Sequence, residues 1–165
     1  VYNIQDNIVA LATVPGKSAL NVVRCSGSGV LRLYKDLTGL KKTPRPNFSH
    51  LKTVFSNNII VDELMVTYFM SPKSFTGQDM LELSVHGGFV VVTKIIALIE
   101  RHGFRQALPG EYSYRAFING KIDLIQAEAI ASLISSKSAL FLYSSPRSAS
   151  RDVCTAVKGL LGFCL

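Results

Sequence analysis

The sequence predicts an α+β fold in which helices flank a mixed or antiparallel sheet. Residues 80–86 alternate strictly between apolar and polar side chains, which is typical of a strand with one buried face. Residues 59–70 are rich in β-branched and aromatic side chains and follow an Asn-Asn turn signal, which favours an antiparallel hairpin. Residues 89–101 place apolar side chains at helical spacing. Together these stretches indicate a sheet with a helix packed beside it.

The first half of the chain is predicted to contain mostly strands. Residues 7–13 form an apolar run typical of a buried strand, and residues 20–25 form a second strand that ends at a Ser-Gly-Ser-Gly loop. The spacing of apolar side chains predicts a short helix over 30–37. Further strands or near-strands are expected at 51–55, 58–61 and 63–69.

The second half is predicted to contain two helices joined by turns. The helix over 89–101 is expected to stop at Gly103, and residues 108–113 are expected to form a turn. Asp123 can cap a second helix, which is expected to run to about residue 136, and Gln126 completes a variant of the capping box. Residues 137–165 are rich in Ser and Ala and are expected to be the least ordered part.

Composition limits the classes of protein and partner. The 165 residues are 48% hydrophobic and 18% charged, which suits one globular domain, or one domain and part of a second. The net charge of +7 favours anionic partners. No apolar run approaches the roughly 20 residues that a membrane span needs. The three cysteines have neither the spacing of a zinc site nor that of a disulfide framework, so no metal site is expected.

Several polar residues stand out against this background. Glu82, Ser84 and His86 share the polar face of the 80–86 strand, which is equally the pattern of an ordinary strand with a solvated face. Arg24 lies at a strand end, where it can clamp a carboxylate or phosphate or form a surface ion pair. The basic loop over 41–46 fits contact with RNA phosphate, but a solvated connection is the favoured interpretation.

Two Gly-Lys pairs are not phosphate-binding loops. That motif needs a glycine five positions before the Gly-Lys pair, but residue 11 is Leu and residue 115 is Arg. The second pair is also followed by Ile122, which has no hydroxyl for a metal ion. GTP hydrolysis by this mechanism is therefore not expected from these residues.

Three blocks in series resemble a known family. They are Ile-Val-Ala-Leu-Ala-Thr at 8–13 with Val-Val-Arg-Cys-Ser-Gly at 22–27, Ser-Phe-Thr-Gly-Gln-Asp at 74–79 with His-Gly-Gly at 86–88, and Pro-Gly-Glu-Tyr-Ser at 109–113 with Asn-Gly-Lys at 119–121. In this order and spacing they closely resemble the N-terminal domain of the MnmE/TrmE family of tRNA-modification GTPases. The resemblance covers roughly residues 4–136.

The resemblance implies a function in one-carbon transfer to tRNA. Family members act with the flavin-dependent MnmG/GidA protein to modify C5 of the wobble uridine. Their N-terminal domain is similar to folate-binding aminomethyltransferase domains, binds 5-formyl- or 5,10-methylenetetrahydrofolate and forms a homodimer. A helical domain with an inserted GTPase domain follows, and that GTPase domain binds GTP, Mg²⁺ and K⁺. The expected location is the cytoplasm, or the mitochondrion in a eukaryote.

The folate-contacting positions of the family match Arg24, Glu82 and Lys121. A pterin ring presents adjacent N–H donors that one carboxylate can accept in parallel, which suits Glu82. The folate glutamate tail is anionic, which suits Arg24 and Lys121. We expect these three side chains to converge on one pocket; the resemblance assigns no catalytic residue.

The departures from the family define the expected domain organisation. We expect a folate-binding and dimerisation domain over 1–120, the beginning of a truncated helical domain over 121–165, and no GTPase domain. The chain is then a fragment or a truncated product. One alternative is a free-standing folate-dependent aminomethyltransferase, for which Asp79 and Glu111 are the nearby acid or base candidates. The other alternative is a small basic RNA-binding module.

Overall fold

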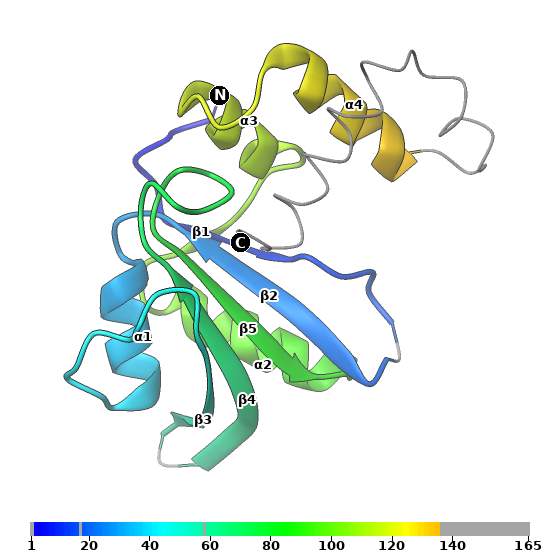
Figure 1. The fold of residues 1–165 in the computed structure, drawn as a ribbon. Coiled ribbons are helices and arrows are strands. Elements are labelled where there is room, and N and C mark those ends of the chain that lie inside the picture. Colours follow the sequence, from blue (N-terminus) through cyan, green and yellow to red (C-terminus); the bar gives the residue numbers. More distant parts are fainter. Residues whose placement is uncertain (1, 17, 58, 136–165) are drawn as a thin grey trace.

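A computed structural model describes residues 2–16, 18–57 and 59–135 and shows an α+β fold (Figure 1). The strands are β1 (Ile8–Leu11), β2 (Leu20–Ser26), β3 (Ser49–Ser56), β4 (Ile59–Phe69), β5 (Met80–His86) and β6 (Arg105–Gln106). The helices are α1 (Val30–Thr38), α2 (Phe89–Glu100), α3 (Glu111–Ile118) and α4 (Leu124–Ser135). The expected α+β fold with a mixed sheet and flanking helices is therefore confirmed.

The described strands form one sheet in the order β3-β4-β5-β2-β1-β6. Every neighbouring pair is antiparallel except β1 and β6, which are parallel. The predicted hairpin is present as β3 and β4, with a bulge between Val54 and Phe55. Residues 59–69 form one strand, so the division at residue 62 predicted from the sequence is wrong.

The core lies between one face of the sheet and helices α1 and α2. The apolar side chains of β5 that alternate along the strand, Leu81, Leu83 and Val85, are buried on this face. They pack in one cluster with the inward residues of the two helices, which include Leu33 and Ile95. The other face of β2–β5 points away from these helices. The sheet thus has a covered face and an open face.

Helices α3 and α4 lie beyond one end of the strands (Figure 1). The predicted cap of α4 is confirmed, because the Gln126 amide donates to Asp123 Oδ1 at 2.8 Å and Gln126 Oε1 accepts from the Asp123 amide at 3.1 Å. Helix α3 corrects the sequence prediction, which placed Glu111 in a turn; that turn ends at Gly110, and α3 begins at Glu111. Its charged residues face inward, so it lacks the apolar period that identifies a helix. The expectation of disorder for 137–165 lies outside the described residues.

Candidate functional site

Arg24 and Glu82 form an ion pair on the open face of the sheet. They lie directly opposite each other on antiparallel strands β2 and β5, and Arg24 Nε is 2.7 Å from Glu82 Oε1. Their neighbours Val23 and Leu81 point into the core, so strand alternation sends both charged side chains to the other face. The two side chains are 16% and 20% exposed. The structure therefore brings together two of the three predicted binding residues in a partly desolvated position.

Lys121 lies against the neighbouring loop between β4 and β5. Its ammonium group donates a hydrogen bond to the Pro72 carbonyl at 3.0 Å. Its side chain also passes close to Gly77, where a Cβ atom would lie 3.2 Å from Lys121 Cγ. Lys121 is thus held by the loop, and its ammonium group donates to Pro72 rather than to Glu82.

A chain of hydrogen bonds links the Lys121 turn to the strand ends that carry the ion pair. The Asn119 amide group donates to the Thr76 carbonyl at 2.6 Å, and the Thr76 and Ser26 hydroxyls are 2.8 Å apart. Ser26 pairs with Met80, two residues beyond Arg24 and Glu82 on their strands. That separation is about 7 Å along a strand. The loop therefore places Lys121 at the same end of the sheet as Arg24 and Glu82.

A cavity of about 370 Å³ opens beside Arg24. Its walls include residues 10–12 around the end of β1, Phe75 of the loop, residues 107–113 and Ile130 of α4. This volume is within the range of small-molecule sites, which combine an apolar lining with a few charged or polar groups. Glu82 and Lys121 are not among its lining residues, so this cavity by itself does not unite the three predicted residues.

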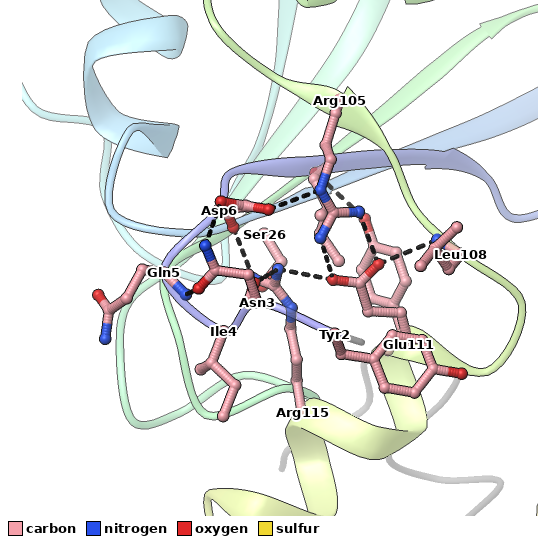
Figure 2. Close-up of polar contacts among 12 residues, drawn as sticks. Tyr2, Asn3, Ile4, Gln5, Asp6, Ser26, Arg105, Leu108, Glu111 and Arg115 are labelled. Carbon is pink, nitrogen blue, oxygen red and sulfur yellow. Dashed lines mark hydrogen bonds and ion pairs between the residues drawn. The ribbon is translucent and has the colours of Figure 1, made fainter.

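The wall formed by α3 is held by a buried ionic cluster, shown in Figure 2. Glu111 and Arg115 are both fully buried, and Arg115 donates to Glu111 Oε1 at 2.8 Å. Arg105 donates to both Glu111 oxygens, at 2.7 and 2.8 Å, and to Asp6 at 2.7 Å. Arg115 also donates to the Asp6 carbonyl and to Gln78 of the loop. The cluster thus ties the N-terminal segment, β6, α3 and the loop together.

The same cluster sets the charge state of Glu111. Burial on its own raises the pKa of this carboxyl, but hydrogen bonds from Arg105, the Leu108 amide and Arg115 outweigh it and lower the pKa to about 2. The same contacts with Glu111 and Asp6 raise the pKa of Arg105 above its usual value. Glu111 and Arg105 are therefore both ionised at neutral pH.

Two side chains that position the site could not be assigned from the sequence. The Tyr112 hydroxyl donates to the Arg24 carbonyl at 2.7 Å and so fixes β2 where it carries the ion pair. Burial raises the pKa of Tyr112 well above its usual value, which keeps this donor protonated. Gln78 accepts from Ser26 and donates to the Ile4 carbonyl. The spacing of Glu111 and Arg115, four residues apart, is the sequence signal that indicates this helix.

The carboxylates considered for acid–base chemistry have structural partners. Asp79 accepts the Ser71 amide at 2.8 Å, and Glu111 belongs to the ionic cluster. His86 instead pairs with Asp62, whose carboxylate accepts from the His86 amide and lies 2.7 Å from His86 Nδ1. Within the described residues, no group of three His, Cys, Asp or Glu side chains gathers as a metal ion requires.

Comparisons with known proteins identify the family of this chain. The family model described as GTP-binding protein TrmE N-terminus matches residues 7–121. Proteins named tRNA modification GTPase MnmE are 42% identical over 136 residues in Sulfurovum sp. (strain NBC37-1) and 46% identical over 133 residues in Campylobacter fetus subsp. fetus (strain 82-40). A third, from Dechloromonas aromatica (strain RCB), is 42% identical over 153 residues.

These matches cover most of this chain and a smaller part of the relatives. The three alignments cover 82%, 80% and 92% of the chain but 30%, 30% and 34% of the relatives. The chain thus spans about a third of the length of these relatives. All three predicted binding residues lie inside the region matched by the family model. The chain belongs to the MnmE/TrmE family, and the matched region is the family's N-terminal domain.

Proposed function

We propose that this domain binds a reduced folate, 5-formyl- or 5,10-methylenetetrahydrofolate, through Arg24, Glu82 and Lys121. The observation that carries the proposal is the Arg24–Glu82 pair, 2.7 Å apart on the open face of the sheet. Tetrahydrofolate, when bound, supplies a one-carbon unit. Glu82 would accept the adjacent N–H donors of the pterin, because a carboxylate has about four lone-pair positions and Arg24 Nε takes one.

Arg24 and Lys121 would have different tasks in this site. Arg24 neutralises the charge of Glu82 and orients its carboxylate, so that the carboxylate stays in place when the ligand displaces water. Lys121 comes from the turn after α3 and carries a positive charge toward the anionic glutamate tail. The cavity beside Arg24 supports the proposal, because its apolar walls and Phe75 suit a flat aromatic ligand.

Membership of the family supports a proposal for the role of the whole protein. The relatives are named for tRNA modification and GTPase activity. We propose that the chain supplies the one-carbon unit for modification of the wobble uridine of tRNA, together with the flavin-dependent MnmG/GidA protein in the cytoplasm. GTP, Mg²⁺ and K⁺ would bind the portion of the relatives that this chain does not match. Among the described residues, no helix combines the length and apolar character that crossing a bilayer requires.

We also propose that the domain forms a homodimer through the open face of the sheet. Large apolar side chains are exposed on the strands of that face, including Leu20 and Leu51, each 57% exposed. A second copy would cover them and contribute a further wall to the folate site. Sedimentation equilibrium at the concentrations of the binding experiment checks this proposal, and a monomer at all concentrations would contradict it.

A calorimetric titration with 5-formyltetrahydrofolate tests the folate site. Glu82→Ala should weaken binding by roughly 10- to 100-fold, because a hydrogen bond to a charged group contributes about 1.5–3 kcal/mol. Glu63→Ala is the matched control, since Glu63 is an exposed carboxylate on neighbouring strand β4. It should bind like the wild type. Wild-type affinity in Glu82→Ala, or equal loss in both variants, would refute the assignment.

A further inference from the structure

The positive charge of the chain is concentrated along one edge of the fold. We define the basic edge as the cationic side chains of α1, the 39–48 connection and β3: Arg32, Lys35, Lys41, Lys42, Arg45 and Lys52. With Asp36, the single carboxylate between residues 30 and 52, this segment carries +5 of the net charge of +7. Figure 1 shows α1 and the connection side by side at the β3 edge of the sheet. Twenty-three residues thus hold most of the excess charge.

The 39–48 connection is anchored to the rest of the fold and displays exposed cations. It leaves α1 at Gly39, which has a left-handed φ of 68°. Pro44 is buried, and the Asn47 amide donates to the Tyr68 carbonyl of β4 at 2.8 Å. Between these anchors, Lys41 and Lys42 are exposed. A solvated connection needs no such anchors, whereas a binding loop gains affinity when its groups are held in place beforehand.

An exposed aromatic ring lies within the basic edge. Phe48 is 47% exposed, and the guanidinium carbon of Arg45 lies 3.9 Å from the centre of its ring. Aromatic rings and guanidinium planes are the surfaces on which proteins stack unpaired RNA bases. Positive charge alone would be enough to attract an acidic protein surface. The exposed Phe48–Arg45 pair adds a surface for base stacking, and it therefore favours RNA as the partner.

The backbone of Phe48 lies next to the row of paired residues that crosses the sheet to Glu82. Phe48 directly precedes Ser49, which is in register with Thr67, and Thr67 is in register with Glu82. Strand β3 is two strand spacings from β5, which is about 10 Å. A nucleotide stacked on Phe48 would therefore be held near the strand that carries Glu82.

We propose that the basic edge is an RNA-binding surface: its cations contact phosphates, and Phe48 with Arg45 stacks one unpaired base. This inference rests on the proposed function, in which tRNA is the substrate, and it assigns that substrate a place on this domain. The contact is electrostatic in the main and thus sensitive to salt. The cations of the basic edge set the position of the RNA phosphate backbone, and the Phe48 ring selects unpaired RNA over duplex RNA.

The experiment measures binding of the whole 165-residue chain to a fluorescent tRNA transcript between 50 and 200 mM salt. Lys41→Gln/Lys42→Gln should reduce the slope of log affinity against log salt by about 1.4–1.8, since each of the two lost phosphate contacts removes roughly 0.7–0.9. Lys94→Gln/Arg101→Gln removes one exposed charge from α2 and one directly after its end, and it is the matched control, whose slope should change little. Phe48→Leu should weaken tRNA binding at least ~5-fold with an unchanged slope, because base stacking is lost.

Three controls separate the possible outcomes. A fully paired RNA duplex should bind Phe48→Leu and wild type equally, and a polyglutamate competitor should displace tRNA poorly. Any one of four results would overturn the inference. These are no tRNA binding at 50 mM salt, equal slope changes in the two charge variants, unchanged affinity in Phe48→Leu, and effective competition by polyglutamate. The charge variants should still bind 5-formyltetrahydrofolate. If the wild type binds tRNA but does not bind 5-formyltetrahydrofolate, the proposed folate function is refuted and the RNA surface is not.

Discussion

Glu111 is the residue on which the N-terminal segment, β6 and α3 converge. Its two oxygens accept hydrogen bonds from Arg105, Arg115 and the Leu108 amide at 2.7–2.9 Å. Because Glu111 and Arg115 are fully buried, removal of the Glu111 charge leaves Arg115 without its counter-ion in a desolvated position. The Glu111 side chain thus holds α3 in place at the end of the sheet.

Acid should therefore destabilise the fold through Glu111. Its pKa of about 2 in the folded state lies below the ordinary value of 4.5, so the unfolded chain binds the proton first. The stabilisation is fully present above about pH 4.5 and is lost as the pH falls toward 2. Urea unfolding at intervals from pH 7 to pH 2.5 measures this loss.

The control for the acid experiment is Glu111→Gln. Loss of the charge should lower the free energy of unfolding at pH 7 by about 3–5 kcal/mol, because it leaves buried Arg115 unpaired. The stability of this variant should then fall less steeply below pH 4.5 than that of the wild type. Parallel curves for the two proteins would contradict the role given to Glu111.

At the scale of elements, the close approach of the β4–β5 loop to the Lys121 turn depends on a glycine. Gly77 has a φ of 74°, and a Cβ atom there would lie 2.9 Å from Asn119 Cβ and 3.2 Å from Lys121 Cγ. Any side chain at this position would combine backbone strain with a clash against the turn. The loop and the turn can pack together only because residue 77 has no side chain.

Gly77→Ala should destabilise the domain more than Gly103→Ala. Gly103 also has a positive φ, of 84°, but a Cβ atom there would meet nothing within 4 Å. The Gly103 variant should lose about 1 kcal/mol from backbone strain alone. The Gly77 variant should lose about 1–3 kcal/mol more, from overpacking. Urea unfolding of both variants measures the difference, and equal losses would show that the loop and turn are not in close contact.

Elements with a clear hydrophobic period could be predicted from the sequence, and elements held by polar contacts could not. The alternation in 80–86 fixes which side chains of β5 are buried, and the capping pair Asp123 and Gln126 marks the start of α4. Helix α3 was not predicted, because Glu111 and Arg115 face inward and bind partners in other segments of the chain. Sequence periodicity detects burial of apolar surface, not ionic clusters.

The candidate site shows the same limit. Strand alternation sends Arg24 and Glu82 to the polar faces of their strands, but it does not say which strands pair. The two residues are 58 positions apart, and only the register of β2 with β5 makes them neighbours. The partnership of Lys121 with Pro72 and Gly77 likewise depends on loop packing, which no local pattern encodes.

At the scale of the whole molecule, the two faces of the sheet are assigned different tasks. One face carries the apolar core under α1 and α2, and the open face carries the Arg24–Glu82 pair. The proposed RNA surface follows the β3 edge, two strands away from Glu82. If both proposals hold, the domain would place a one-carbon donor and its nucleic acid acceptor side by side, since neither proposed site interrupts the core.

The structure of the whole chain crystallised with 5-formyltetrahydrofolate tests the central claim most directly. We expect the N–H edge of the pterin within 3.2 Å of the Glu82 carboxylate, Arg24 still beside Glu82, and the glutamate tail near Lys121. A pterin bound elsewhere, with Glu82 and Arg24 paired only to each other, would contradict the proposed site.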